Sequence, residues 1–293
     1  MSSHLAKMAN LGFISPPEWL PANVMYEGLT GSVAYGCSSD TSDMDVVGFC
    51  FPPKELIFPH LAGDIPGFGR QKKRFDQFQQ HHVKWESGRK EYDFTIYSIV
   101  KFFQLCMDNN PNMLDVLFLP ADCVLKSSKV AELVRANKTR FLHKGSYHKF
   151  KGYAYAQLHK MDNKNPVGKR KELVERFGFD TKFACHLVRL AYECQQILEE
   201  RTLDLRRNRE HLKAIRRGDI PEQEIRDWFT NHEKILDDLY HTSSIPHSPD
   251  EAELKELLLN CIEEQYGSLT HAIVIEDDNL AVLRQIKDLV KDV

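Results

Sequence analysis

The pattern of apolar and polar residues changes along this chain. In the first hundred residues, apolar and polar positions alternate over short runs, as is typical of strands with one buried face. Later segments carry apolar residues every three or four positions, which is the spacing of an amphipathic helix. Strands followed by helices predict the α+β class, with a catalytic part and an attached helical part. Strand character extends over residues 24–30, 43–51, 74–85 and 90–99.

Helical periodicity dominates from residue 97 onward. The Asn-Pro pair at 110–111 ends the first of these helices. The pattern is clearest over 169–201, where five apolar residues form one stripe. Residues 54–72 are expected to form a loop. Further helices are predicted at 1–12, 126–137, 145–161, 205–217, 221–240, 251–265 and 279–291.

Composition and charge restrict the function classes. Of the 293 residues, 42% are apolar, which is enough for a sizeable core. The net charge of −3 argues against a generally basic nucleic-acid-binding surface, although it is compatible with a local basic groove. None of the seven cysteines forms a CxxC pair, so reduced thiols are expected. No apolar run reaches about 20 residues and no signal-peptide core is present, so we expect a cytoplasmic protein without a membrane partner.

Two aspartates open the second predicted strand. Asp43 and Asp45 are two residues apart, so they project from the same face with their Cα atoms roughly 6.5–7 Å apart. Met44 and Val46 point to the opposite face, into the core. Neighbouring carboxylates repel each other, and a divalent cation such as Mg²⁺, which prefers oxygen ligands, reverses that repulsion. The pair therefore suggests a metal site.

A third carboxylate and a glycine turn complete the candidate site. Asp93 lies in a run of strand formers and would join the pair from a neighbouring strand, with Glu91 on the same face as the alternative. Gly31 and Ser32 lie upstream of the pair, where a glycine lets the backbone approach a ligand and a helix start offers N–H groups to an anion. An anion cradle beside a carboxylate pair suggests a nucleoside triphosphate with Mg²⁺. A turn with a capping residue and a commonplace Gly-Ser are the structural alternatives.

These residues resemble the motif of the DNA polymerase β-like nucleotidyltransferase superfamily: Gly31-Ser32, a spacer of ten residues, then Asp43-Met44-Asp45-Val46. The chain is most similar to the branch of predicted nucleotidyltransferases associated with RNA ligases of bacteria and phages. Four later stretches resemble motifs of that branch: "KFFQLCMDNNPNMLDVLFLP" (101–120), "FKGYAYAQLHKM" (150–161), "FDTKFACHLVRL" (179–190) and "AIRRGD" (214–219). The resemblance covers roughly residues 22 to 225, and it departs from the pattern at Asp115, where the branch has Glu.

The resemblance implies a small mixed sheet that carries three acids, followed by a helical domain that closes over the nucleotide. It places the catalytic domain at 1–120 and the helical domain at 121–293. It also implies that Asp43, Asp45 and Asp93 bind two Mg²⁺ ions, for which Mn²⁺ is a possible substitute. In the same way, Gly31 and Ser32 are expected to hold the β- and γ-phosphates.

Other side chains have both a functional and a structural interpretation. Lys182, His186 and Arg189 share one face of the predicted helix, opposite its apolar stripe, and could face the phosphates or the base; a solvated face is the alternative. Tyr153 could stack on a base, but core packing is favoured. His81 and His82 resemble a metal pair, yet adjacent residues of a strand point to opposite faces. Basic stretches at 69–74 and 164–171 could contact a nucleic-acid backbone or be ordinary surface loops.

The leading hypothesis is a Mg²⁺-dependent nucleotidyltransferase that moves a nucleoside monophosphate from a nucleoside triphosphate to an acceptor hydroxyl. RNA is the first expectation for the acceptor, either the 3′ end of a tRNA or a broken RNA, on the strength of the resemblance and the basic stretches. Modification of a protein side chain or of a small molecule is the second. A nucleotide-binding regulatory module without catalysis is a third, and the presence of all three acids argues against it.

Overall fold

Five strands form one mixed sheet in the computed structural model, which describes residues 3–268 except 39–41, 66, 70–73, 86–89 and 163–165. The strand order is β3-β4-β2-β1-β5, and β2 and β4 are parallel whereas the other neighbours are antiparallel. The mixed sheet with its helices confirms the α+β prediction. The strands are β1 (Val24–Leu29), β2 (Met44–Cys50), β3 (Gln77–Trp85), β4 (Lys90–Ser98) and β5 (Val124–Ser127).

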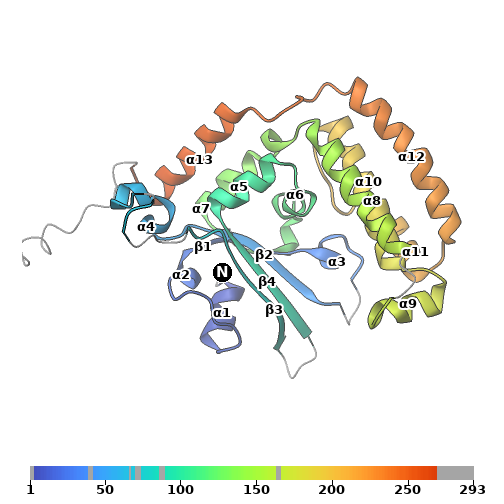
Figure 1. The fold of residues 1–293 in the computed structure, drawn as a ribbon, viewed down its shortest axis with the longest axis horizontal. Coiled ribbons are helices and arrows are strands. Elements are labelled where there is room, and N and C mark those ends of the chain that lie inside the picture. Colours follow the sequence, from blue (N-terminus) through green and yellow to red (C-terminus); the bar gives the residue numbers. More distant parts are fainter. Residues whose placement is uncertain are drawn as a thin grey trace, which may run out of the picture.

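Helices cover both faces of the sheet and extend beyond it on one side (Figure 1). α1 and α2 lie on one face, and α5, α6 and α7 lie on the other (Figure 1). α10 packs against α8, α11 and α12, and this group lies beyond α3 (Figure 1). The helices are α1 (His4–Asn10), α2 (Leu20–Asn23), α3 (Gly31–Ala34), α4 (Lys54–Ile57), α5 (Ile99–Met107), α6 (Pro111–Leu117), α7 (Lys129–Ala136), α8 (Gly145–Met161), α9 (Lys169–Phe177), α10 (Thr181–Glu200), α11 (Arg209–Arg217), α12 (Glu222–Thr242) and α13 (Glu251–Tyr266).

Capping residues set the starts of the helices that matter for the site. Asn110 begins α6, because its side chain accepts hydrogen bonds from the backbone N–H groups of Asn112 (3.1 Å) and Met113 (3.4 Å). Asp180 begins α10 in the same way, with its carboxylate 2.9 Å from the backbone nitrogen of Lys182. Gly178 ends α9 in a left-handed conformation, with φ +86°. The predicted helix over 169–201 is therefore two helices that meet at this glycine.

The sheet separates two apolar cores. The larger core contains Tyr26 and Phe49 and continues without a break into the helices as far as α13. The smaller core lies on the opposite face, where Val46 and Phe94 pack against α1. Because consecutive strand residues face opposite ways, β1, β2, β4 and β5 supply side chains to both cores, whereas the described side chains of β3 contribute to the smaller core.

A buried carboxylate joins α1 to the sheet. Glu27 of β1 is 0% exposed. It accepts hydrogen bonds from the hydroxyl of Ser3 (2.7 Å) and from the backbone N–H groups of His4 (2.7 Å) and Leu5 (3.0 Å). These donors include N–H groups of the first turn of α1, which have no partner within the helix. Glu27 therefore acts as an end cap that the sheet provides for the helix.

The elements depart from the predictions in two further places. Residues 126 and 127 belong to β5, which pairs with β1, so the helix predicted from 126 begins at Lys129. This strand belongs to the sheet although it follows the domain boundary that we predict at residue 120. The predicted loop at 54–72 contains α4 and a 3₁₀ turn, Pro59–Ala62. The helix predicted at 279–291 lies outside the described residues. Within the described ranges, the model has no helix that is both long and apolar enough to cross a bilayer.

Candidate active site

The register of the two parallel strands brings two of the predicted acids together. Asp45 on β2 and Asp93 on β4 are direct partners across the strand pair, so their Cα atoms are separated by about 4.8 Å, the spacing of neighbouring strands. Asp43 immediately precedes β2. Val46 is 0% exposed on the opposite face, as the alternation predicts. The described residues thus include three aspartates at one end of adjacent strands.

Gly31 lies directly against the carboxylate of Asp45. Its φ is +63°, and a Cβ atom at this position would lie 2.3 Å from Asp45 Oδ2. The backbone N–H of Thr30 donates to the backbone carbonyl of Asp45 at 2.8 Å. Ser32 follows in α3, a helix of four residues. The glycine is needed for two reasons, its left-handed conformation and the closeness of the acid.

The charges around Asp45 leave this carboxylate short of positive partners. Burial raises its pKa, and the neighbouring Asp93 raises it further, as does Asp43. Lys182 on α10 opposes these effects. A carboxylate whose pKa is raised by like-charged neighbours indicates a site that a cation would stabilise. The three acids therefore suit a divalent metal with oxygen ligands.

A bulge in β3 supplies hydrogen-bond donors to Asp93. The register shifts between Gln80 and Val83, and His82 has a φ of 58°. Its backbone N–H donates to Asp93 Oδ1 at 2.8 Å, and the Nδ1 atom of His81 lies 3.4 Å from Asp93 Oδ2. His82 also pairs with Glu91, which raises the pKa of its imidazole. The expectation that the two histidines face opposite ways is wrong, because the bulge breaks the alternation and both contact acids.

Four basic side chains lie opposite the acids, on α9, α10 and α11: Arg170, Lys182, His186 and Arg216. Burial lowers the pKa of Lys182, and Arg170 and Arg216 lower it further. The pKa of His186 is well below its usual range because of burial and the same cations. Arg170 pairs with Asp180 at 2.9 Å. Among the described side chains, no carboxylate lies within 4.0 Å of the Lys182 or Arg216 cation. Arg170, Lys182 and Arg216 form a cationic cluster that offers positive charge to an anion.

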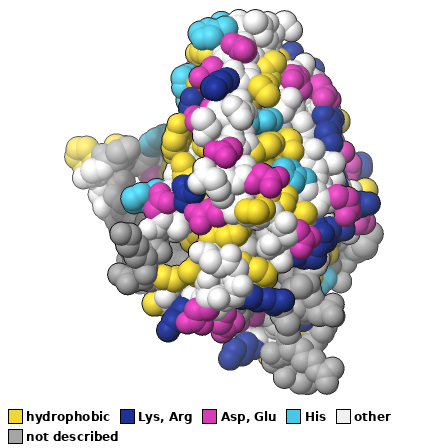
Figure 2. Space-filling view, turned by 90° about the vertical axis from the view of Figure 1, so that its right-hand side faces the viewer, with side chains coloured by type: hydrophobic (Ala, Val, Ile, Leu, Met, Phe, Trp, Pro, Cys, Tyr) yellow, Lys and Arg dark blue, Asp and Glu magenta, His cyan; other side chains and the backbone are white. Residues whose placement is uncertain are grey.

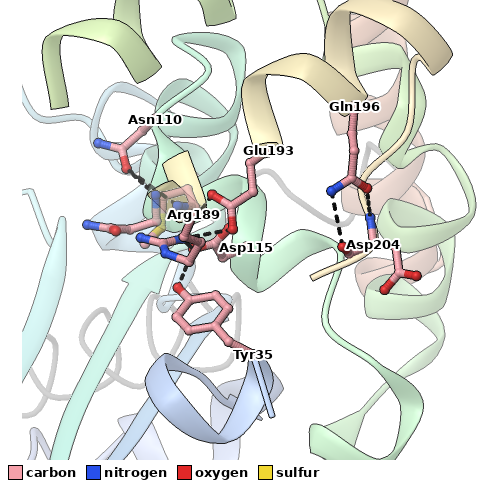
Figure 3. A network of polar contacts seen from close by, with 9 residues as sticks. Tyr35, Asn110, Asp115, Arg189, Glu193, Gln196 and Asp204 are labelled. Carbon is pink, nitrogen blue, oxygen red and sulfur yellow. Dashed lines mark hydrogen bonds and ion pairs between the residues drawn. The ribbon is translucent and has the colours of Figure 1, made fainter. Parts of the chain in front are cut away.

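Arg189 is buried in an ionic network rather than solvated (Figure 3). Its Nη1 atom lies 2.6 Å from Asp115 on α6 and 2.9 Å from Glu193 one turn along α10. The hydroxyl of Tyr35, just after α3, donates to Asp115 at 2.5 Å, and the guanidinium lies 4.3 Å from the Tyr35 ring centroid. The pKa of Glu193 is raised well above its usual range because the carboxyl is buried. Arg189 thus joins the turn after Gly31 to the helical part of the chain.

A cleft of about 470 Å³ opens beside Asp45. Its inner wall includes Gly31, His186 and Arg189, and its outer wall is formed by β4, the start of α6 and α8. Tyr153 of α8 lies in this outer wall and is 36% exposed, so the expectation of core packing is wrong. The volume falls within the range of small-molecule sites, about 300–1,000 Å³. The outer wall consists of Thr95, Tyr97, Asn112, Tyr153, Gln157 and Lys160.

Together, the mixed sheet, the paired acids and the glycine turn define the class of the polymerase β-like nucleotidyltransferases. A family model described as the RNA repair pathway DNA polymerase beta family matches residues 7–259, and the chain belongs to this family. The match confirms the resemblance to the polymerase β-like superfamily and places the chain in an RNA repair family.

Two individual proteins are similar to this chain. An uncharacterized 38.9 kDa protein in the nrdC-mobD intergenic region of Enterobacteria phage T4 is 25% identical over 247 residues, which are 81% of this chain. The chain spans only 65% of the length of that phage protein. The crystal structure of a nucleotidyltransferase-like protein from Exiguobacterium sibiricum 255-15 matches with 9% identity, 86% coverage of this chain and 69% of that one, and a TM-score of 0.28. A superposition this loose adds nothing to the assignment.

The sequence-based reasoning missed part of the site. Arg170 and Arg216 lie within stretches that resemble family motifs or basic loops, but nothing local shows that they converge on Lys182. Asp115 is a departure from the family pattern, and its buried pairing with Arg189 depends on a contact between α6 and α10. A lone acid in an otherwise apolar helix was the available signal, because buried charges require a partner.

Proposed function

We propose that this chain moves a nucleoside monophosphate from a nucleoside triphosphate to a hydroxyl of RNA, with Mg²⁺. One observation carries the proposal. Asp45 lies beside Asp93 in the strand register, touches the Gly31 turn and faces the cationic cluster. Carboxylates for a metal and cations for a polyphosphate, arranged around one point, are what this transfer requires.

Asp43, Asp45 and Asp93 would hold the metal ions. When bound, Mg²⁺ would stabilise negative charge at the α-phosphate and lower the pKa of the acceptor hydroxyl. Asp93 would also accept the proton of that hydroxyl. The hydrogen bond from the backbone N–H of His82 holds the carboxylate of Asp93 in place. Ser32 and the Gly31 turn would bind the terminal phosphates through hydroxyl and backbone N–H groups.

The cationic cluster would neutralise the triphosphate and the departing pyrophosphate. Lys182 is the member whose charge acts directly on Asp45. His186 is held neutral by its surroundings, so it would offer one N–H donor rather than a charge. Arg189 lines the same cleft, but its Nη1 atom is engaged by two carboxylates, so its role would be to shape the nucleotide site.

The description of the family supports RNA as the acceptor. An acceptor has access to Asp93 from the β3 side, where His81 is half exposed. Figure 2 shows a different face, the outer side of the helical part, on which acidic, basic and apolar side chains are interspersed. A mixed face of this kind lacks the concentration of positive charge that binds a nucleic-acid backbone. We therefore assign the acceptor to the β3 side.

A labelling experiment tests the proposal. Each α-³²P-labelled nucleoside triphosphate is incubated with the protein and Mg²⁺, together with total RNA, protein extract or neither. We expect label on RNA with the wild type and none with Asp45→Asn, because the amide cannot hold the metal. Asp76→Asn is the matched control, since this carboxylate is exposed and pairs only with Arg74 among the described residues.

Stability separates a catalytic defect from a folding defect. An acid with a raised pKa destabilises the folded state at pH values above its usual pKa, so Asp45→Asn is expected to keep or raise the thermal midpoint at pH 7. Label on protein or on a small molecule would refute RNA as the acceptor. Full transfer by Asp45→Asn would refute the metal role of the acids.

A further inference from the structure

We propose that the outer wall of the cleft binds the nucleoside of the triphosphate, with the base against the ring of Tyr153 and its edge recognised by the amides of Asn112 and Gln157. This nucleoside subsite rests on the proposed function and extends it. The family match does not assign these residues. The inference comes from where the cleft lies relative to the acids and the cations.

The two sides of Asp45 differ in character. Lys182 acts on Asp45, and Arg170 and Arg216 act on Lys182; none of the three is among the described residues that line the cleft. Asp45 itself does line the cleft. In a nucleoside triphosphate, the α-phosphorus joins the nucleoside on one side to the pyrophosphate on the other. If the pyrophosphate lies on the cationic cluster and the α-phosphate at Asp45, the nucleoside extends into the cleft.

The acceptor is the competing occupant of the cleft, because it also approaches the α-phosphorus from the side opposite the pyrophosphate. The proton of its hydroxyl must reach Asp93. Within the described part of the chain, Asp93 is not among the residues that line the cleft, and its carboxylate faces the β3 bulge at His81 and His82. The acceptor is therefore favoured at the β3 edge and the nucleoside in the cleft.

The chemistry of the outer wall suits a nucleobase. Tyr153, Gln157 and Lys160 are spaced by four and three residues, so they lie on one face of α8. The hydroxyl of Tyr153 accepts a hydrogen bond from the Asn110 side chain at 3.0 Å, which holds the ring at the mouth of the cleft. Aromatic rings stack on any base, whereas an amide both donates and accepts and can distinguish one base edge from another.

β4 contributes Thr95 and Tyr97 to the outer wall. Thr95 and Tyr97 follow Asp93 at two-residue intervals, so all three side chains project from the same face of the strand. Tyr97 and Tyr153 both line the cleft; burial raises the pKa of Tyr97, and Tyr153 raises it further. A base held between α8 and β4 would thus lie on the face of β4 that also carries Asp93, the acid proposed to accept the proton of the acceptor hydroxyl.

Equilibrium binding tests the subsite. Isothermal titration calorimetry on the full chain, with Ca²⁺ in place of Mg²⁺ to prevent turnover, measures Kd for ATP, GTP, CTP, UTP and inorganic triphosphate. Tyr153→Ala is expected to weaken the tightest nucleotide about 5- to 100-fold, the usual effect of losing one stacking ring, and to leave triphosphate unchanged. Tyr153→Phe keeps the ring but loses the bond to Asn110, so it should weaken binding less than Tyr153→Ala does. Gln157→Leu should change the ranking of the four nucleotides.

Tyr155→Ala is the matched control, because this tyrosine lies on the same helix but bonds to Glu233 of α12. It should bind every ligand as the wild type does. Unchanged nucleotide binding by Tyr153→Ala would overturn the subsite and leave the proposed function standing, as would an equal loss of triphosphate binding. If the wild type bound neither nucleotide nor triphosphate, both proposals would fall.

Discussion

Replacing Arg189 with methionine removes the cation that two buried carboxyls share. Asp115 is 1% exposed, Glu193 is 2% exposed and Arg189 itself is 5% exposed, so water cannot replace the lost interactions. Breaking a buried ionic group by removing one partner costs about 3–5 kcal/mol. Methionine keeps most of the buried volume, so the loss of stability comes from the missing charge rather than from a cavity. We expect the free energy of unfolding at pH 7 to fall by about that amount.

The pH dependence makes this prediction specific. Burial raises the pKa of both carboxyls, and Arg189 is the largest opposing influence on each. A carboxyl with a raised pKa binds its proton more readily in the folded state, so stability falls as pH rises from about 4, the usual pKa, toward the raised value. Without the arginine both pKa values rise further. The deficit of Arg189→Met should therefore be larger at pH 8 than at pH 5.

Urea unfolding at pH 5, 6, 7 and 8, followed by tryptophan fluorescence, measures this deficit. Arg207→Met is the control, since Arg207 pairs with Glu200 at the surface and an exposed pair contributes at most about 1 kcal/mol. A loss below about 1 kcal/mol at pH 7 that does not vary with pH would refute the ionic network as a source of stability.

Two further substitutions probe the catalytic side of the site. Gly31→Ala places a methyl group 2.3 Å from Asp45 Oδ2 at a φ of +63°. The variant should therefore lower stability by about 1–2 kcal/mol and lower the rate of transfer at least about tenfold. Thermal melting and the labelling assay measure these two effects, and a wild-type rate would contradict the contact. Lys182→Met should raise KM for the nucleotide about tenfold without loss of stability, because it removes a partly buried cation from beside two others. Steady-state kinetics check this, and an unchanged KM would exclude Lys182 from the phosphate site.

Local patterns predicted the acids because alternation is a property of the strand itself. Asp45 and Val46 face opposite ways in any regular strand, and this holds in the structure. That Asp93 is the direct neighbour of Asp45 depends on strand order, which the family resemblance supplied and periodicity alone does not contain. The boundaries of α8 match the prediction at 145–161 because its periodicity is unbroken.

Features that depend on contacts between distant segments of the chain were not predictable from local patterns. The bulge at His81 and His82 exists only where β3 pairs with β4, so the sequence of β3 gives no sign of it. β5 has four residues, which is too short for a clear alternation. Arg189 shares a helix face with Lys182, and helical spacing predicts the same surroundings for both. They differ because α6 packs beside Arg189 and places the carboxyl of Asp115 against its guanidinium.

The carboxylate of Glu27 links Ser3, His4 and Leu5 to β1, which has a neighbouring strand on each side. A protein shortened past Leu5 would leave this acid enclosed with none of its three donors. The loss of a few terminal residues would then destabilise β1, and the end of β1 leads directly into the Gly31 turn. Tags and truncations at this end are therefore changes to the interior of the protein, and an assay of the proposed transfer on such a protein would reflect them.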